Sequence, residues 1–433
     1  MTALPGPPTQ AAALPPVGSA ARIRRSRHLK PYNRLLWLAC LGNLAAAVVL
    51  LSTDDLTADT AFTAAGINIA VAALVRQQLV INALFWLATR AKTHLPLRVR
   101  WGLGKIYSFG GVHVGAAISA SCWYVMFCVL TIHAGEDAFL IATMLAATVI
   151  LVGMLVTSLP RMRAGHHNVF ELVHRFGGWS LLAVIWAQTI ALTLAEGGGS
   201  LSVASSPAVW LLAVTTLSIA APWLRLRRVP VRVVKPSDHV AIAEFDYGVT
   251  PFAGSSTAVS RHPLREWHSF ANVPSPGRSG FRLTISRAGD WTGDFIDDQP
   301  QHVWVKGIPT AGVGNIDQLF RSVLWVATGS GIGPCLPHLL AKTAPARLLW
   351  STRTPERTYG EELVAEIREA IPSAVIWDTT ERGKPDLLQL AYDEALAHGV
   401  EAVICISNQP TTWTIVEGLE QRGIPAFGAI WDS

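Results

Sequence analysis

Apolar residues follow two different patterns along the chain. The first half contains six long apolar segments, each long enough to cross a hydrocarbon layer of about 30 Å. These segments cover residues 34–52, 61–88, 105–132, 139–158, 170–194 and 207–224. The pattern predicts a six-helix transmembrane bundle over residues 34–225. It is preceded by a Pro- and Ala-rich stretch, then basic residues, which predicts a disordered basic tail over residues 1–33.

Beyond residue 229 the long apolar runs give way to short segments that are typical of strands. Apolar and polar residues alternate in VRVVKPSDHVAIAEFDY and GFRLTISRAG, which predicts a small β-barrel over residues 230–320. From Leu324 onward, short apolar runs such as VLWVAT, ARLLWST and AVICIS are separated by helical segments. This alternation predicts a parallel, doubly wound α/β sheet over residues 321–433.

Charge changes the picture by giving the bundle a direction. Lys and Arg occur in the N-terminal tail, in the second and fourth connections between the apolar segments and directly after the sixth segment. The other three connections carry only acidic charges. By the positive-inside rule, both termini and the whole C-terminal part are expected in the cytoplasm, and the chain in the cell membrane.

Composition supports the same interpretation. Hydrophobic residues make up 50% of the chain and charged residues only 15%, against about 25% charged residues in soluble domains. The net charge of +5 comes from basic residues that flank apolar segments, as membrane anchors do. The expected partner is therefore a lipid bilayer and not a nucleic acid.

Two histidines occur inside predicted spans, where polar groups are usually functional or paired. His113 and His174 lie in spans that both enter from the cytoplasmic side, His113 about two turns into its span, and each has a glycine pair nearby. Two imidazoles on facing helices suit axial ligation of one heme b iron. The alternative is two unrelated histidines with ordinary hydrogen-bond partners. Arg76, near the middle of the second span, and Asn82 must face the bundle or an aqueous cleft.

The stretch VATGSGIGP is a candidate nucleotide site. Gly329, Gly331 and Gly333 follow a predicted strand and precede a predicted helix. Glycines there permit a tight turn and let backbone N–H groups approach a pyrophosphate at the helix N-terminus. The alternative is a tight turn without a ligand. The candidate contacts are Thr328, Gly329, Ser330, Gly331, Gly333 and Pro334.

The order of β-barrel, G-x-G-x-G-P and parallel sheet resembles the ferredoxin–NADP reductase (FNR) superfamily. Behind six spans, it is similar to the NADPH oxidase and ferric reductase flavocytochromes. GGVHVG and PLREWHSFA resemble a divergent branch, the membrane FNR-like oxidoreductases found in bacteria and fused to adenylation domains in fungi. The resemblance implies a transmembrane bundle followed by a cytoplasmic FNR-like module, which has a flavin-binding β-barrel and an α/β nucleotide domain.

The resemblance also implies cofactors and flavin contacts. NAD(P)H, with NADPH favoured, would reduce FAD, and electrons would pass to a single inner-leaflet heme or to a membrane acceptor. EWHSFA occupies the place of the family's His-Pro-Phe-Thr stretch, which puts His268, Ser269 and Phe270 at the flavin. RLTISRAGDWT resembles the flavin-side strand of the oxidases, with Arg287 at the FAD pyrophosphate and Thr292 in the Gly-Asp-Trp-Thr ending.

Further assignments concern the nicotinamide nucleotide. WSTRTPERTYGEEL resembles the strand end that holds a ribose 2′-phosphate, where Ser351 and Arg353 are suited to bind it. CISNQP resembles the Cys-Gly-Pro turn near the nicotinamide, so Cys405 is expected to help position the hydride, and Trp431 is expected to stack on the flavin. The family's outer histidine pair would fall about four turns further along each helix, where this sequence has no histidine.

Two alternatives stay open at this point. One is a heme-free FAD reductase of a quinone or another hydrophobic substrate. The other is a non-enzymatic redox-sensing membrane protein with a degenerate flavin fold, an interpretation favoured by the altered flavin motifs. The electron acceptor is not defined by the sequence and could be a quinone, a metal chelate, oxygen or a hydrophobic small molecule.

Overall fold

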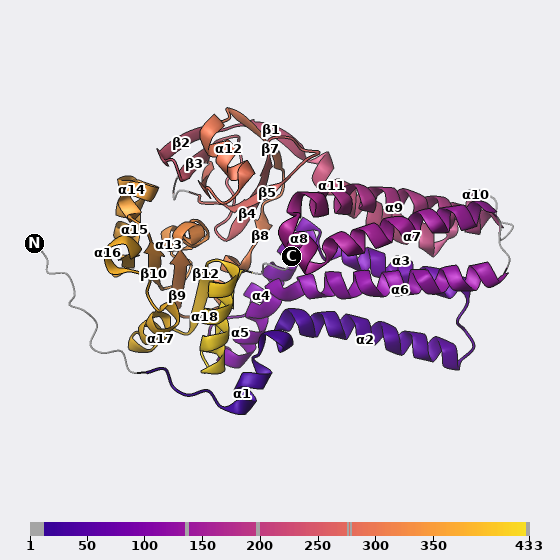
Figure 1. The fold of residues 1–433 in the computed structure, drawn as a ribbon, viewed down its shortest axis with the longest axis horizontal. Coiled ribbons are helices and arrows are strands. Elements are labelled where there is room, and N and C mark those ends of the chain that lie inside the picture. Colours follow the sequence, from indigo (N-terminus) through magenta and orange to yellow (C-terminus); the bar gives the residue numbers. More distant parts are fainter. Residues whose placement is uncertain (1–12, 135–137, 196–199, 275–276, 278, 430–433) are drawn as a thin grey trace, which may run out of the picture.

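The computed structural model describes residues 13–134, 138–195, 200–274, 277 and 279–429. A long helix bundle projects from one side of a mixed α/β body, which contains an antiparallel β domain and a parallel-sheet domain (Figure 1). The polypeptide enters the bundle first and reaches the two other domains after residue 224.

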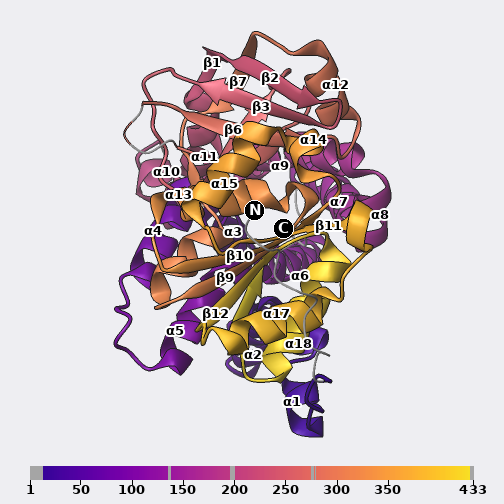
Figure 2. The same cartoon turned by 90° about the vertical axis from the view of Figure 1, so that its left-hand side faces the viewer.

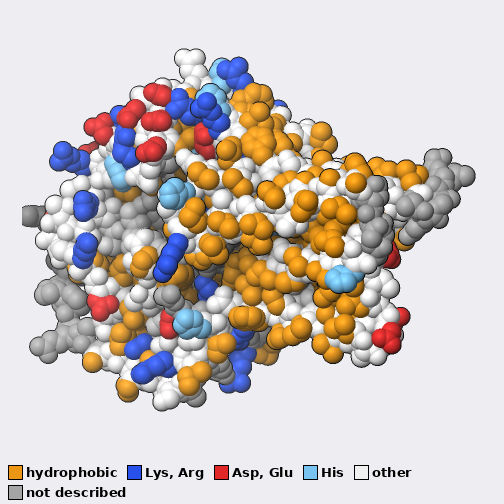
Figure 3. All heavy atoms as spheres, turned by 45° about the vertical axis from the view of Figure 1, so that its right-hand side comes forward, with side chains coloured by type: hydrophobic (Ala, Val, Ile, Leu, Met, Phe, Trp, Pro, Cys, Tyr) orange, Lys and Arg blue, Asp and Glu red, His pale blue; other side chains and the backbone are white. Residues whose placement is uncertain are grey.

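Within the described residues, five helical segments are long and apolar enough to cross a membrane, or six if a bent pair counts as one. Large apolar side chains cover the outside of the bundle (Figure 3), and Leu38 and Val149 are 68% and 72% exposed. The helices are α2 (Pro31–Ser52), α3 (Ala58–Leu74), α4 (Gln78–Thr89), α6 (Gly110–Ala134), α7 (Ala138–Ser158), α9 (His167–Ala195) and α11 (Pro207–Leu224), with short α8 (Pro160–Gly165) and α10 (Ser200–Ser205) between them.

The second predicted span is the bent pair. Helices α3 and α4 meet at an angle of 70° across a break of three residues. Arg76 lies in this break. The segment predicted as a span over residues 61–88 is therefore bent, and α4 packs on the α/β body, where Ile81 and Phe85 join its hydrophobic core.

Asn82 shows how α4 is attached to the β domain. Its Nδ2 donates to the carbonyl of Pro309 at 3.0 Å, and its Oδ1 accepts from the N–H of Ala311 at 2.8 Å. A polar side chain that looked costly in lipid is therefore satisfied by backbone groups of another domain.

The third predicted span begins later than expected. Residues 97–109 form α5 (Leu97–Leu103) and the 3₁₀ helix η2 (Gly104–Phe109), and α6 begins only at Gly110. Gly104 packs so tightly on the parallel-sheet domain that an added Cβ would lie 2.7 Å from the ring of Phe427. His113 consequently lies one turn into the long helix, not two.

The β domain has two antiparallel sheets around an apolar core that includes Leu283, Ile285 and Phe295. Their strand orders are β1-β7-β4-β5, with β8 added to β4, and β2-β3-β6. The domain starts before the predicted residue 230 because β1 pairs with β7. Its elements are β1 (Leu226–Pro230), β2 (Arg232–Ser237), β3 (Val240–Phe245), β4 (Ser255–Ser260), β5 (His268–Ala271), β6 (Phe281–Ser286), α12 (Asp290–Asp298), β7 (His302–Lys306), β8 (Thr310–Ala311) and η3 (Val313–Leu319).

The last domain is the parallel sheet expected from the alternation of strands and helices, in the order β11-β10-β9-β12-β13. Helices α13 and α15 lie on one face and α17 and α18 on the other (Figure 2). The chain reverses its direction of winding at β9, so the crevice for a ligand lies at the carboxyl ends of β9 and β12. The elements are β9 (Val323–Thr328), η4 (Gly329–Gly331), α13 (Ile332–Ala341), β10 (Ala346–Thr352), α14 (Pro355–Tyr359), α15 (Glu361–Ala370), β11 (Val375–Asp378), α16 (Thr379–Arg382), α17 (Leu387–Ala397), β12 (Ala402–Ile406), α18 (Gln409–Gln421) and β13 (Ala426–Gly428).

The N-terminal tail is held against this body from residue 13 onward. It contains α1 (Ser19–Arg24) and η1 (Arg27–Leu29). The guanidinium of Arg25 lies 4.1 Å from the centre of the Trp101 ring and 3.7 Å from a carboxylate oxygen of Glu420. The prediction of disorder therefore does not hold for residues 13–33, and residues 1–12 lie outside the described part.

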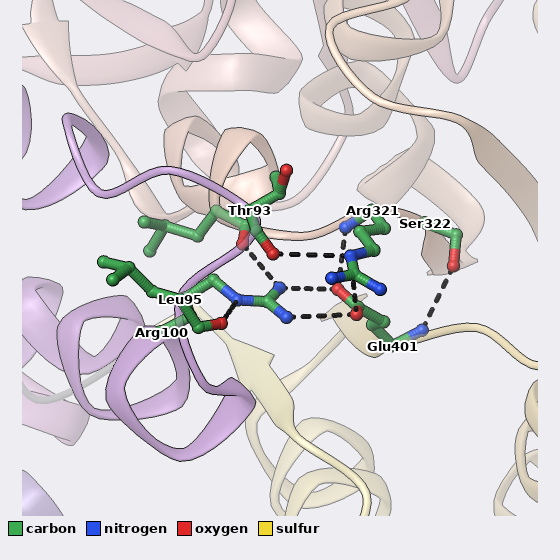
Figure 4. A network of polar contacts seen from close by, with 7 residues as sticks. Thr93, Leu95, Arg100, Arg321, Ser322 and Glu401 are labelled. Carbon is green, nitrogen blue, oxygen red and sulfur yellow. Dashed lines mark hydrogen bonds and ion pairs between the residues drawn. The ribbon is translucent and has the colours of Figure 1, made fainter.

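Buried ion pairing joins the bundle to the parallel-sheet domain (Figure 4). Arg100 of α5 is 2% exposed and donates to both carboxylate oxygens of Glu401 at 2.5 and 3.0 Å. The same guanidinium donates to the carbonyls of Leu95 and Leu319, and Glu401 also accepts from the N–H of Arg321 at 2.8 Å. These bonds satisfy the guanidinium and fix α5 on the domain that follows.

Candidate functional site

The glycine loop lies at the crevice of the parallel sheet. Gly329 has φ +47°, a conformation that favours glycine, and Gly331 passes so close to β12 that an added Cβ would lie 2.0 Å from the carbonyl oxygen of Ile406. Ser330 is exposed, and Pro334 falls in the first turn of α13. The loop thus leads directly into the N-terminus of α13 at the crevice end of the sheet, which is the arrangement that binds a pyrophosphate.

Two hydroxyl groups border the loop at the strand ends. Oγ1 of Thr328, at the end of β9, lies 2.5 Å from Oγ of Ser407, just past β12. The sequence analysis missed Ser407, although its place directly after an apolar strand run was a usable signal. This pair is suited to hydrogen-bond the polar edge of a nicotinamide or a ribose.

Cys405, the predicted hydride-positioning residue, points elsewhere. Its side chain is fully buried in the apolar core beneath α17 and α18, with Ile415 and Leu419. Burial raises the pKa of its thiol to about 12. This placement does not support the predicted catalytic role, because strand alternation turns Cys405 to the core. Trp431, the other predicted catalytic residue, lies outside the described residues.

The predicted 2′-phosphate contacts lie on the neighbouring strand. Ser351 pairs in register with Thr328, and Arg353 follows it with an exposed side chain. Trp350 supports the loop because its Nε1 donates to the carbonyl of Gly329 at 3.0 Å. Tyr359, which the sequence analysis missed, packs edge-on against Trp350, and burial raises its pKa to about 12.

Strand β5 presents its residues to different surroundings. His268 stacks on Trp291 of α12 at 4.3 Å between ring centroids, and Phe270 lies 6.0 Å from the same ring. Ser269 points the other way and is exposed. Burial, and secondarily His167, lowers the pKa of His268 to about 4, so its imidazole is neutral at neutral pH. Of the three, Ser269 is exposed, whereas His268 and Phe270 are half-buried, and Nε2 of His268 has no hydrogen-bond partner among the described residues.

Strand β6 faces the glycine loop directly. Thr284 lies against Gly333, whose added Cβ would be 3.4 Å from the Cβ of Thr284. Thr284 is only 8% exposed, yet within the described part of the chain its Oγ1 has no hydrogen-bond partner. A buried hydroxyl without a partner is uncommon in native proteins, and here it marks the junction of the β domain and the nucleotide loop.

Arg287 and Thr292 are engaged inside the β domain. Thr292 Oγ1 accepts from the N–H groups of Ala288 and Gly289 at 2.8 and 3.1 Å, which holds the start of α12. Arg287 forms an ion pair with Asp297 at 2.6 Å. In this conformation its guanidinium contacts a carboxylate of the β domain itself.

The helix bundle contains a cavity of about 660 Å³. His113 and His174 both line it, with ring centroids 6.2 Å apart. Nδ1 of His113 lies 2.9 Å from the carbonyl oxygen of Ala72, whereas Nδ1 of His174 is buried and has no partner among the described residues. The structure thus brings together the two histidines that the sequence singled out. Other lining residues come from five helices and include Thr63, Arg76, Ser121, Arg175, Trp179 and Thr189.

A row of three tryptophans connects the β domain with this cavity. Trp267, next to His268, lies 6.3 Å from Trp223 at the end of α11, and Trp223 lies 5.0 Å from the cavity residue Trp179. Lys306 stands 4.7 and 5.5 Å from the rings of Trp267 and Trp223. The sequence analysis did not select these tryptophans, because only the fold aligns residues so distant in the chain.

Known proteins match the last domain alone and also nearly the whole chain. Residues 313–433 match the family described as the C-terminal domain of adenylate-forming reductase 03009. Adenylate-forming reductase 06235 of Coprinopsis cinerea is 42% identical over 424 residues, and adenylate-forming reductase 03009 of the same fungus is 41% identical over 426 residues. The homologues of this chain are adenylate-forming reductases. The predicted closeness to FNR-like proteins fused to adenylation domains in fungi is thereby confirmed.

The match covers 95% of this chain but 41% of each fungal reductase. The chain therefore spans less than half the length of these curated relatives. Among solved structures, a ferredoxin NADP+ reductase from Neisseria gonorrhoeae with bound FAD and NADP is 14% identical, with a TM-score of 0.38 over 47% of this chain and 98% of that one. A flavohemoglobin from Malassezia yamatoensis is 14% identical, with a TM-score of 0.42 over 82% and 98%. These likenesses are weak.

Proposed function

We propose that the chain is a membrane-embedded oxidoreductase that takes electrons from NAD(P)H through FAD and delivers them into its helix bundle. The observation that carries the proposal is the contact between Gly333 and Thr284. There a phosphate-type glycine loop at a topological switch point faces a buried hydroxyl without a partner. Homology to proteins named reductases supports the reaction class.

The chain's own residues divide the nucleotide between them. The N–H groups of Gly331 to Gly333 would bind the pyrophosphate, while Thr328 and Ser407 would fix the nicotinamide end. Ser351 and the exposed guanidinium of Arg353 would bind a 2′-phosphate by charge-assisted hydrogen bonds, which favours NADPH over NADH.

The residues around the contact between Gly333 and Thr284 fit a flavin. Thr284 offers an unused hydroxyl, Ser269 lies on the open side of β5, and the neutral imidazole of His268 supports that strand through Trp291. When bound, FAD supplies the conversion of a two-electron hydride into single electrons. The protein's contribution is to place the flavin between Gly333 and the tryptophan row.

A membrane location is supported by two features of the bundle. Its large apolar side chains point outward, as in helices that face lipid. The basic connections between α4 and α5 and between α7 and α9 lie at the end of the bundle that carries the α/β body, and the acidic connection between α2 and α3 lies at the other end (Figure 1). We therefore infer that the nucleotide site lies in the cytoplasm, with both chain ends on the same side.

The histidine pair fits one heme. The ring centroids of His113 and His174 lie 6.2 Å apart and both side chains line the cavity, so the two imidazoles could hold one heme iron. The carbonyl of Ala72 orients His113 through Nδ1 and leaves Nε2 to act as the ligand. His113 and His174 would hold the iron, and the heme would supply a one-electron acceptor at the inner end of the bundle.

A second candidate function is a heme-free reductase of a lipophilic acceptor held in the same cavity. The observation that favours it is the length of the cavity, which extends from His113 to Thr63 and Thr189 near the other end of the bundle. A pocket of several hundred cubic ångströms with an apolar lining and few polar groups is typical of small-molecule sites.

An absorbance spectrum of the detergent-purified chain, before and after addition of NADPH, tests these proposals. A flavin spectrum that bleaches with NADPH, together with NADPH-dependent reduction of ferricyanide, is expected. A Soret band that shifts on reduction selects the heme, and its absence in active protein selects the lipophilic acceptor. Colourless protein that fails to oxidise NADPH would contradict both and favour a non-enzymatic membrane protein.

A further inference from the structure

Helix α4 carries apolar residues on two opposite faces. Ile81, Phe85 and Ala88 are buried against the α/β body. On the other side Leu79, Trp86 and Leu87 are 50%, 57% and 67% exposed. With Ala83, these three occupy positions i, i+4, i+7 and i+8, which is one continuous helical stripe.

The length of α4 excludes a transmembrane path for it. Its 12 residues extend about 18 Å at 1.5 Å per residue, whereas the hydrocarbon core is about 30 Å thick. The 70° bend after α3 also turns α4 away from the direction of the span that precedes it. An exposed apolar stripe on a helix that leaves a membrane span sideways is placed at the membrane surface and not across it.

Charges next to the stripe match a phospholipid surface. The guanidinium of Arg90 lies 4.2 Å from the centre of the Trp86 ring, and Arg90, Lys92 and Arg98 are all exposed. Tryptophan is enriched at the level of the lipid headgroups, and each Lys or Arg near an anionic surface adds about 1 kcal/mol of attraction. Trp86 and Arg90 together have the chemistry of an anchor in a headgroup layer.

We propose that α4 lies in the cytoplasmic membrane–water interface, with Leu79, Trp86 and Leu87 in the acyl boundary and Arg90 and Lys92 at anionic lipid phosphates. This inference rests on the membrane location proposed above. Continuity of α4 with the span α3 commits the stripe to lipid and not to a protein partner.

The opposite side of α4 is bonded to the β domain. Gln78 Nε2 donates to the carbonyl of Ile308 at 2.9 Å, and Asn82 bonds to Pro309 and Ala311. The strand segment on which these bonds act belongs to the β domain that would hold the flavin. The lipid surface would therefore set the height and tilt of the β domain through a rigid helix.

Photocrosslinking in vesicles tests the proposal with controls that the chain itself offers. A diazirine amino acid would replace Leu87 in the full chain, reconstituted in vesicles with and without phosphatidylserine. Leu38 on the outside of α2 is the positive control. Leu396 on α17, which is 58% exposed on the parallel-sheet domain, is the matched negative control.

Lipid adducts are expected at positions 38 and 87 and not at 396, with at least a twofold lower yield at 87 when phosphatidylserine is left out. Adducts at 38 without adducts at 87, or a protein–protein crosslink from 87, would overturn the interfacial helix and leave the membrane location intact. No lipid adduct at 38 would overturn the membrane location itself, and with it this inference.

Discussion

The two halves of the molecule differ in how closely they are packed. At the nucleotide loop there is no spare room: Gly331 would place a Cβ 2.0 Å from a backbone oxygen. The bundle, in contrast, encloses about 660 Å³ of cavity and displays its large apolar side chains on the outside. A close-packed loop binds a ligand through backbone groups that must approach it, whereas a hollow bundle is completed by what fills it.

The two halves also meet through polar groups, although each is apolar where it packs internally. Arg100 with Glu401, Asn82 with the β domain, and Arg175 with the carbonyls of Leu264 and Arg265 all cross the boundary. Hydrogen bonds of this kind fix orientation in addition to the apolar contact that Ile81 and Phe85 make with the α/β body. The comparison implies that each half can be damaged separately, and the following variants test that separation.

The largest effect is expected from His113→Ala and His174→Ala. Each removes one imidazole from the cavity, so the heme band and electron delivery into the bundle should be lost while NADPH–ferricyanide activity stays within about twofold of the parent. Absorbance and stopped-flow reduction measure this. His133→Ala, on the same helix as His113 but exposed at its far end, is the control, and a heme band that persists in both cavity variants would disprove the ligand assignment.

Arg100→Ala should break the joint between the halves. Loss of a buried partner leaves Glu401 with only Arg321, and we expect a destabilisation of about 3 kcal/mol, with Arg98→Ala as the exposed control. The hydrogen bond from Arg100 lowers the pKa of Glu401. The stabilisation is therefore fully present at neutral pH and is lost as the pH falls through that lowered pKa. Thermal unfolding at neutral and acidic pH measures this, and equal acid sensitivity of parent and variant would contradict it.

Gly331→Ala should damage the reductase half alone. The added methyl forces the loop away from β12, and an overpacking cost of about 1–3 kcal/mol corresponds to roughly 5- to 150-fold weaker NADPH binding. NADPH titration and ferricyanide reduction measure this. Gly102→Ala, where nothing lies within 4 Å of the new Cβ, should behave like the parent. Unchanged NADPH affinity in Gly331→Ala would place the nucleotide elsewhere.

Trp223→Leu should slow electron transfer between two otherwise intact halves. If the tryptophan row conducts electrons to the cavity, the rate of transfer into the bundle should fall about tenfold, about 1.4 kcal/mol in activation free energy, while ferricyanide reduction is unaffected. Trp223→Phe should recover part of the rate because a ring is retained. Trp210→Leu, exposed on the same helix, is the control. Equal transfer rates in all three variants would exclude this route.

The smallest effect is expected from Lys306→Met. Burial, and next Arg175, lowers the pKa of Lys306 to about 8, so the folded state disfavours the charged amine. Stability should accordingly rise as the pH increases from about 8 toward the ordinary lysine value near 10.4, because the unfolded state binds more protons in that window. Unfolding midpoints from about pH 7.5 to 10 should show this rise in the parent and a flatter profile in the variant.

How much of this could be predicted depends on how local each feature is. The parallel strands, the glycine loop and the histidine pair are set by short-range patterns, and the structure has them where the sequence placed them. Cys405 was assigned a catalytic role because its motif resembled a catalytic turn, whereas the strand's alternation directs its side chain to the core. Ser407 and Tyr359 were missed because a hydroxyl gains meaning only from the strand end beside it.

The sequence by itself determined the division into an apolar bundle and an α/β body, since apolar run length and charge distribution act locally and independently of packing. Only the tertiary structure decided that residues 78–89 leave the bundle, that Thr284 faces Gly333 and that three tryptophans line up between the two halves. These features depend on contacts between segments that are distant in the chain. The free energy of such contacts depends on both partners, so no single segment determines it.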